Sequence, residues 1–250
     1  QYSLLGSCMM SAISESNSCR VLSIQSHVVS GSVGNKSAVF PLQLLGFDVD
    51  FINSVQFSNH TGYPNKWKGT VLSGQELTAL CTGLQDNHLF HYDYLLTGYI
   101  GSETFLTSII STLDAIKAVN PNAKYVCDPV LGDHDQYYVP AELVQIFRQQ
   151  LIPRAYMITP NQFEAELLTE SKIHSEDDAV RALISLRKLG PEVVVLTSAE
   201  LKTLPEDANT MNINSDCSEE NESLFCYVLY PIPSSASDRT SSASDRTSSA

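Results

Sequence analysis

Glycine is scarce toward the end of the chain: none of the 12 glycines among its 250 residues lies beyond Gly190. Phosphate groups are commonly bound by backbone amides of a glycine turn that opens a helix. Such a turn must lie within the first 190 residues or be missing from this sequence. Basic residues are also few, with 15 Lys and Arg against 28 Asp and Glu and a formal net charge of −13. This imbalance argues against nucleic acid or an anionic membrane as a partner.

Paired cysteines and long apolar runs are missing as well. No C-x-x-C pair occurs, which argues against a disulfide framework and a zinc site. No apolar run approaches the roughly 18 residues of a membrane span, and the first residues lack the basic region and apolar stretch of a signal peptide. We therefore expect a cytoplasmic protein with reduced thiols. The six cysteines are Cys8, Cys19, Cys81, Cys127, Cys217 and Cys226.

Several common catalytic patterns are also absent. Neither H-E-x-x-H nor G-x-S-x-G occurs, which removes the usual support for zinc proteolysis and serine hydrolysis. The segment GSVGNKS at residues 31–37 approaches a phosphate loop, but Asn35 separates Gly34 from Lys36 and the spacing fails. We interpret these glycines as a turn that lets the backbone approach a ligand closely.

The two ends of the chain differ in composition from the middle. Residues 1–18 are rich in serine without a clear period, and residues 234–250 repeat the unit SSASDRT. Polar, repetitive segments bury too little apolar surface to offset the entropy lost on ordering. We expect residues 1–18 and 231–250 to be disordered, and residues 19–230 to form the folded domain.

Short apolar strands alternate with helical patterns along this middle part. Strands are predicted at residues 21–24, 49–55, 94–97, 125–127, 156–159, 193–196 and 224–230. Between them, helices are predicted at 34–45, 73–87 and 105–116, and after residues 140, 161 and 175. This order predicts an α/β fold of three layers, with a mainly parallel central sheet flanked by helices.

Polar residues follow several of the predicted strands. Since ligands bind beyond the carboxyl ends of the strands in open α/β sheets, these residues mark one ligand-binding edge. Alternatively, some of them cap the following helices. The polar strand ends are Ser26, Thr97, Asp128, Thr159 and Thr197.

Two motifs at this edge carry chemistry. Asp128 and Asp133 flank a glycine turn in DPVLGD, a pattern that suits a hard cation bridging to phosphate oxygens, although such residues are also ordinary turn formers. In TPNQFE, Asn161 at a helix start places Glu164 at the third helical position. There the Glu164 carboxylate either caps the helix or reaches a metal through water.

Over roughly residues 19–200 the chain resembles the pyridoxal kinases of the ribokinase-like superfamily. The run FSNHTGY has no structural explanation that we can give, so the resemblance is specific. The matching strings are RVLSIQSH at 20–27, NSVQFSNHTGY at 53–63, LTGY at 96–99, VCDPVLGD at 126–133 and ITPNQFEAELL at 158–168.

The resemblance implies transfer of the γ-phosphate of ATP to the 5′-hydroxyl of pyridoxal, pyridoxine or pyridoxamine, with Mg²⁺, a monovalent cation (K⁺ or Na⁺) and a homodimer. It assigns the vitamer pocket to Ser26, Val33, Thr61 and Tyr99. It assigns nucleotide contacts to Asp128, Tyr138, Asn161, Thr197 and Ser198. It assigns the binding of the metal ions to Asp128, Asp133, Thr159, Glu164 and Thr197, with Glu164 acting through water.

The chain departs from the family pattern in two places. The loop between Asp133 and Tyr138 is shorter than usual, and the Gly-Thr-Gly-Asp motif, which supplies the anion hole and the catalytic base, is excluded by the glycine count. We therefore expect a C-terminally truncated kinase fold of doubtful activity. The alternatives are a non-catalytic vitamer-binding or dimerising module, a related hydroxymethylpyrimidine or sugar kinase, and a fragment that does not fold stably.

Overall fold

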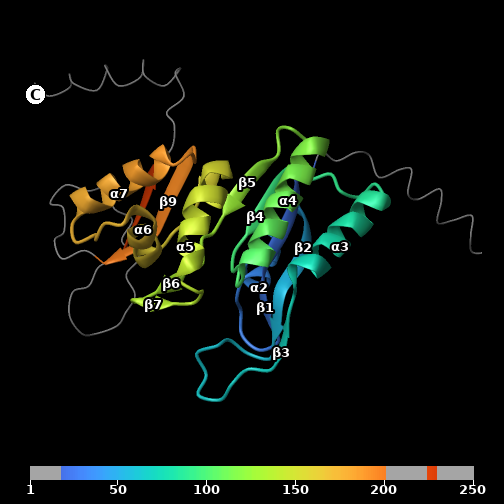
Figure 1. Ribbon diagram of the computed structural model, residues 1–250, viewed down its shortest axis with the longest axis horizontal. Coiled ribbons are helices and arrows are strands. Elements are labelled where there is room, and N and C mark those ends of the chain that lie inside the picture. Colours follow the sequence, from blue (N-terminus) through green and yellow to red (C-terminus); the bar gives the residue numbers. More distant parts are fainter. Residues whose placement is uncertain (1–17, 201–223, 230–250) are drawn as a thin grey trace, which may run out of the picture.

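The computed structural model describes residues 18–200 and 224–229. They form an eight-stranded sheet in the order β10-β9-β8-β5-β4-β1-β2-β3, which confirms the predicted α/β fold (Figure 1). The six inner strands run parallel, whereas β3 and β10 pair antiparallel at the two edges. The strands are β1 (Arg20–Val28), β2 (Asp48–Phe57), β3 (Gly69–Val71), β4 (Tyr94–Thr97), β5 (Lys124–Cys127), β8 (Met157–Ile158), β9 (Val193–Glu200) and β10 (Leu224–Leu229).

Helices form where the sequence supplies caps and apolar periodicity. The predicted capping box of Ser73 and Glu76 begins α3, and a second box of Asn161 and Glu164 begins α6. After α5 the chain continues through π-helical (Phe147–Leu151) and 3₁₀ (Ile152–Arg154) turns. The helices are α2 (Asn35–Leu44), α3 (Gly74–Asp86), α4 (Glu103–Val119), α5 (Glu142–Ile146), α6 (Gln162–Thr169) and α7 (Glu176–Lys188).

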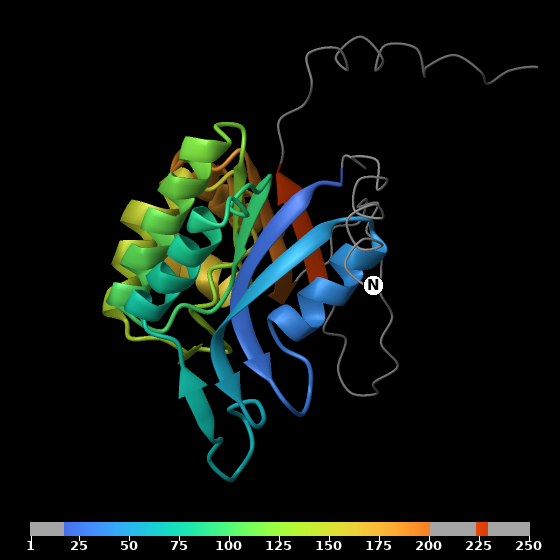
Figure 2. The same ribbon diagram turned by 90° about the vertical axis from the view of Figure 1, so that its right-hand side faces the viewer.

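The main core lies between the sheet and the layer of helices that includes α4. Leu106, Ile109 and Ile116 of α4 are fully buried, as are Leu22 and Ile24 of β1. Figure 2 shows α3 and α4 on this side of the sheet and α2 on the other. Helices thus cover both faces of the sheet near β1 and β2. Residues of these two strands also line the candidate site described below.

The sequence pattern does not predict two of the strand pairings. The three-residue strand β3 extends β2 into a hairpin, and a separate hairpin joins β6 (Gly132–Asp133) to β7 (Gln136–Tyr137). The turn of the second hairpin consists of His134 and Asp135, both with left-handed backbone angles (φ 46° and 58°). Two such residues form the tight turn that suits the twist of a hairpin.

The predictions for the two ends of the chain mainly concern residues that the structure does not describe. The disorder predicted for residues 1–18 and 231–250 falls, apart from residue 18, outside the described ranges. Among the described residues, no helix combines the length and apolar character needed to cross a membrane.

Candidate functional site

A cavity of about 670 Å³ opens at the carboxyl ends of β1, β2, β4 and β5. It brings together all four residues predicted for the vitamer pocket, and Asp128 and Tyr138 from the predicted nucleotide set. These six residues come from five segments of the chain between residues 26 and 138, so only the folded topology unites them. They are Ser26, Val33, Thr61, Tyr99, Asp128 and Tyr138.

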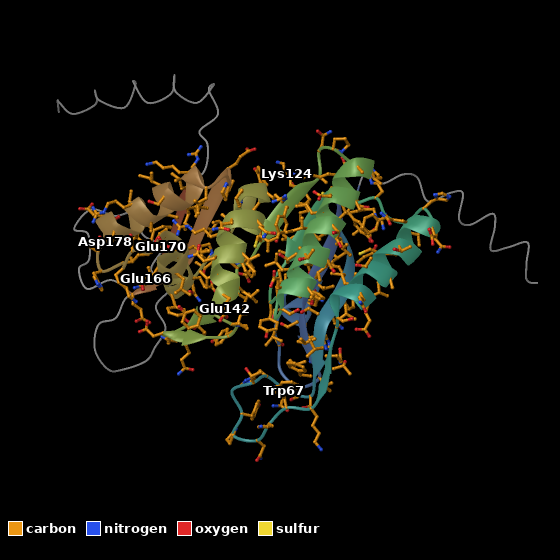
Figure 3. The ribbon with its side chains drawn as sticks, in the orientation of Figure 1. Trp67, Lys124, Glu142, Glu166, Glu170 and Asp178 are labelled. Atoms are coloured by element: carbon orange, nitrogen blue, oxygen red, sulfur yellow. The ribbon has the colours of Figure 1, made fainter. Side chains whose placement is uncertain are left out.

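The loop between β2 and β3 covers one side of this cavity. Its two ends are held together because the Ser58 N–H donates to the Lys68 carbonyl at 2.8 Å, and Trp67 stacks on Phe57 with 3.7 Å between ring centroids. Figure 3 shows Trp67 within this loop. Within the loop the His60 and Tyr63 rings lie 4.5 Å apart. The loop thus supplies aromatic walls that suit a flat ring.

The cavity is apolar with a few polar groups, as small-molecule sites commonly are. Val28, Val33 and Val55 contribute aliphatic surface next to the aromatic walls. Tyr99 lines the cavity, and burial raises the pKa of its hydroxyl, which keeps the group neutral. Its hydroxyl also donates to the carbonyl of Tyr138 at 3.5 Å, which links the segment after β4 to the residue that follows β7.

Asp128 follows the end of β5 and borders the cavity. Its Oδ1 accepts a hydrogen bond from the Thr159 hydroxyl at 3.2 Å, so these two strand-end residues lie together at the predicted edge. No described Lys or Arg lies within 4 Å of this carboxylate. Burial raises the pKa of Asp128 to about 6, and the bond from Thr159 opposes this shift. Asp128 is therefore a largely buried carboxylate without a described cationic partner.

Glu164 performs the capping role that its position predicts. Its Oε2 accepts the Asn161 N–H at 2.9 Å and its Oε1 accepts the Leu131 N–H at 3.1 Å, so it also holds the DPVLGD turn. Burial raises the pKa of Glu164 to about 8, and the charge of Asp128 adds to this rise, while the hydrogen bonds from Asn161 and Leu131 oppose it. The charge of Asp128 therefore acts on Glu164, and both acidic side chains belong to this edge of the sheet.

The oxygen atoms of Asp128, Thr159 and Glu164 are of the kind that binds a hard cation. Carboxylates and hydroxyls are the preferred ligands of Mg²⁺, and a cation would neutralise the repulsion between Asp128 and Glu164. The described residues nevertheless contain no group of three His, Cys, Asp or Glu side chains that could hold a metal ion. Asp133 is separate from Asp128, because it lines a second cavity and its Oδ1 accepts the His134 N–H at 3.0 Å.

The second cavity, of about 450 Å³, lies beyond the β6–β7 hairpin and contains Asp133 and Ser198 from the predicted sets. Lys172 spans this region, with its Nζ 2.7 Å from Glu166 and 3.4 Å from Asp135 of the hairpin turn. Figure 3 shows Glu166 on α6 beside this hairpin. Because Tyr137 and Tyr138 line the first cavity, the hairpin separates the two spaces.

Three strand-end residues behave differently from the prediction. Ser26 lies inside β1 rather than at its end, since the strand continues to Val28. Thr97 is fully buried and bonds the Tyr125 hydroxyl at 2.8 Å, so it supports the core and does not face a ligand. The Thr197 hydroxyl donates to the Pro160 carbonyl at 3.3 Å and lines neither cavity.

Sequence reasoning missed several residues of the first cavity. Gln25, Ser54, Phe57 and Trp67 all line it. Three of them fall within matched strings or beside them, but no local pattern indicates that their side chains face a ligand. The run FSNHTGY at residues 57–63 could have indicated Phe57, but no sequence signal indicates Gln25, Ser54 or Trp67.

Comparison with known proteins identifies relatives of this chain. A family model described as phosphomethylpyrimidine kinase matches residues 88–225, more than half of the chain. Pyridoxal kinase from Arabidopsis thaliana is 59% identical over 183 residues, which cover 73% of this chain and 59% of that protein. Pyridoxal kinase from Dictyostelium discoideum is 46% identical over 208 residues, covering 81% and 68%.

A solved structure agrees with these relatives. The pyridoxal kinase from Leishmania donovani in complex with ADP and pyridoxamine superposes with a TM-score of 0.70 at 40% identity, covering 73% of this chain and 65% of that one. The chain thus spans about 60% of the length of the first curated relatives. The sequence motifs, the fold and these relatives agree, and the chain belongs to the pyridoxal kinase family.

Proposed function

We propose that this chain binds a pyridoxal-type vitamer in the first cavity and serves ATP-dependent phosphorylation of the vitamer 5′-hydroxyl. The observation that carries the proposal is the convergence of Ser26, Val33, Thr61 and Tyr99 on one cavity next to Asp128. The Leishmania donovani relative was solved with ADP and pyridoxamine, which supports a vitamer and a nucleotide as the two ligands.

Each group of residues has a distinct task in this proposal. Val33 and Tyr99 hold the pyridine ring between apolar walls, and the hydroxyls of Ser26 and Thr61 orient it. Asn161, Thr197 and Ser198 contact the nucleotide, and Tyr138 on the hairpin covers it. Phosphoryl transfer depends mainly on positioning and on neutralising charge.

The metal part of the proposal relies on the oxygen donors already described. Asp128 and Thr159 would hold a cation at the edge of the sheet, Glu164 would contact it through water, and the family pattern adds Asp133 and Thr197 to the metal-binding residues. Mg²⁺ and a monovalent cation, when bound, neutralise charge on the phosphates of ATP. The capping role of Glu164 is compatible with contact through water, because a carboxylate oxygen can accept more than one hydrogen bond.

Vitamer binding is tested by titration calorimetry of the purified chain with pyridoxal, hydroxymethylpyrimidine and ribose. We expect pyridoxal to bind most tightly. Ser26→Ala should weaken pyridoxal binding about threefold to tenfold, since it removes one hydrogen bond to the ligand. Ser111→Ala, an exposed change on α4, is the matched control and should bind as the parent does. Tighter binding of hydroxymethylpyrimidine or ribose would contradict the proposal and favour the related kinase.

A second candidate is a module that binds the vitamer without turning it over. The observation that favours it is the lack of any glycine beyond Gly190, which leaves this sequence without the family's Gly-Thr-Gly-Asp motif. Pyridoxal binding together with negligible phosphorylation would identify such a module.

The apolar surface of α2 supports a homodimer. Phe40 and Leu44 of α2 and its C-cap residue Leu45 are 64%, 70% and 75% exposed, and contiguous exposed apolar side chains are typical of an interface. We expect Leu44→Glu to convert a dimer into a monomer, whereas Val119→Glu at the end of α4, which is 52% exposed, should leave the dimer intact. Light scattering at micromolar concentration gives the mass, and a parent chain of only 27.5 kDa would contradict the dimer.

A cytoplasmic location is part of the same proposal. Four described cysteines, Cys19, Cys81, Cys127 and Cys226, carry free thiols. Free thiols persist in reducing compartments, where ATP is also available.

A further inference from the structure

The pairing of β1 with β2 contains an irregularity at the first cavity. Gln25 pairs with Asn53 and Ser26 pairs with Val55, so Ser54 is an extra residue that forms a β-bulge. In a regular strand, successive side chains point to opposite faces. Here the neighbours Ser54 and Val55 both line the cavity, together with Phe57. The bulge therefore changes which β2 side chains face the cavity.

Asn35 holds both strands at this bulge. It is the first residue of α2, is only 1% exposed and does not line the cavity. Its Nδ2 lies 2.9 Å from the Ile52 carbonyl, 2.9 Å from Asn53 Oδ1 and 3.3 Å from the Gln25 carbonyl. The side-chain amide of Asn35 thus donates to oxygen atoms of both β1 and β2. These acceptors belong to residues just before the shift in register.

A buried polar chain connects Asn35 to the cavity wall. The Ser23 hydroxyl donates to Asn35 Oδ1 at 2.7 Å, and Gln25, which lines the cavity, donates to the Ser23 hydroxyl at 3.0 Å. Ser23 and Gln25 are 0% and 6% exposed. Buried polar groups that lose a partner are costly, so this chain fixes the side chains it joins.

Gly34 brings α2 close enough for these bonds. A Cβ at Gly34 would lie 2.3 Å from the Ser26 carbonyl oxygen, and its φ of 47° is one that other residues rarely adopt. The backbone of the α2 start therefore packs directly on Ser26. Gly34 is therefore needed for this close approach, and Asn35 is needed for the bonds to the two strands. The same two residues break the spacing of a phosphate loop in the sequence.

We propose that Asn35 is a positioning residue for the vitamer pocket. By tying β1 to β2 at the bulge, it holds Ser26 of one strand and Val55 and Phe57 of the other at the spacing that a pyridine ring requires. The inference rests on the proposed function, because it takes the first cavity as the vitamer site. It assigns a role in ligand binding to a residue that never touches the ligand.

The test compares Asn35→Asp with Asn120→Asp in the 250-residue chain. Aspartate has nearly the same size but cannot donate to the three oxygens around Asn35. Asn120 is the matched control: it donates to the Tyr92 carbonyl and to Asp93 at the opposite end of the strands. We expect Asn35→Asp to weaken pyridoxal binding by about tenfold or more while ADP affinity changes less than about twofold. Asn120→Asp should change neither affinity.

Ser23→Ala is a milder second variant, in case Asn35→Asp fails to fold. It removes the hydroxyl between Gln25 and Asn35 and should weaken pyridoxal binding about threefold, again without an effect on ADP. A parallel fall in both affinities, or no fall in pyridoxal affinity for either variant, would overturn the role of Asn35.

Hydrogen exchange separates this proposal from the proposed function. If the parent chain does not bind pyridoxal, the proposed function fails, and exchange then decides on Asn35. We expect faster exchange in Ser23→Ala and Asn35→Asp confined to residues 25–28 and 53–57, and in Asn120→Asp confined to the opposite end of the sheet. Uniformly faster exchange, or unchanged exchange at the bulge, would contradict the role of Asn35.

Discussion

The 250-residue chain is expected to phosphorylate pyridoxal at least about 100-fold more slowly than the complete pyridoxal kinase of Arabidopsis thaliana. The two proteins are 59% identical over 183 residues, but these residues make up 59% of the longer protein. The comparison therefore isolates what the remaining part of the relative adds to the part that the two proteins share.

Two separate losses account for this expectation. A positioned general base contributes roughly 10²–10⁴-fold, and the base of the family pattern belongs to the Gly-Thr-Gly-Asp motif, which this sequence lacks. Preorganised amides at a helix start stabilise charge on the phosphoryl oxygens, and a single donor of this kind can contribute about 10²–10³-fold. The two factors need not multiply, because groups that act as a unit are not additive.

A coupled assay with ATP, Mg²⁺, K⁺ and pyridoxal measures the turnover. Asp207 and Asp216 are the alternative bases in the last part of the sequence, but neither follows a glycine or opens an apolar helix. The variants Asp207→Asn and Asp216→Asn should therefore change any residual rate less than about twofold, because neither carboxylate has the sequence context of the family's general base. Turnover of about one per second, within the ordinary range of enzymes, would contradict the expectation.

The parts of the fold that could be predicted are those that depend on sequence signals a few residues long. Ser73 with Glu76 and Asn161 with Glu164 cap helices where the spacing of their side chains predicts, because a capping box needs only four consecutive residues. The parallel order of the strands also follows from the alternation of helices and strands. Elements of a few residues without periodicity, such as β3, carry no such signal.

The resemblance names four residues that the structure brings into one cavity, but tertiary contacts decide where the strand-end residues lie. Thr97 and Thr159 both follow the strand pattern, yet Thr97 bonds Tyr125 in the core whereas Thr159 bonds Asp128 at the edge. Only the neighbouring strand determines which case applies. The bulge at Ser54 is equally invisible, because it depends on the register between β1 and β2 and on the Asn35 amide that holds it.

Replacing the partly buried carboxylate of Asp128 is expected to stabilise the fold while it removes cation binding. The folded-state pKa of Asp128 is about 6, above its ordinary value of 3.8, because burial disfavours the charged form. Between these two values the folded state binds more protons than the unfolded state. The free energy of unfolding therefore falls as the pH rises from about 4 to about 6.

The expected size follows from this shift of about two pKa units. At pH 8 the charged Asp128 lowers the free energy of unfolding by about 2–3 kcal/mol. The side-chain amide introduced by Asp128→Asn still accepts the bond from Thr159 but carries no charge, and the variant also relieves the repulsion that helps raise the pKa of Glu164 to about 8. We expect the variant to melt several degrees higher at pH 8, at about 2–4 °C per kcal/mol, and at nearly the parent temperature at pH 4.

Calorimetric melting at pH 4, 6 and 8, with and without millimolar Mg²⁺, measures both effects. Mg²⁺ should raise the melting temperature of the parent chain at pH 8 and leave Asp128→Asn unchanged, because a ligand stabilises only the state that binds it. Asp114→Asn on the exposed surface of α4 is the matched control and should follow the parent at every pH. Equal destabilisation of Asp128→Asn at pH 4 and pH 8 would show that Asp128 acts through structure rather than charge. An undiminished response to Mg²⁺ would place the cation elsewhere.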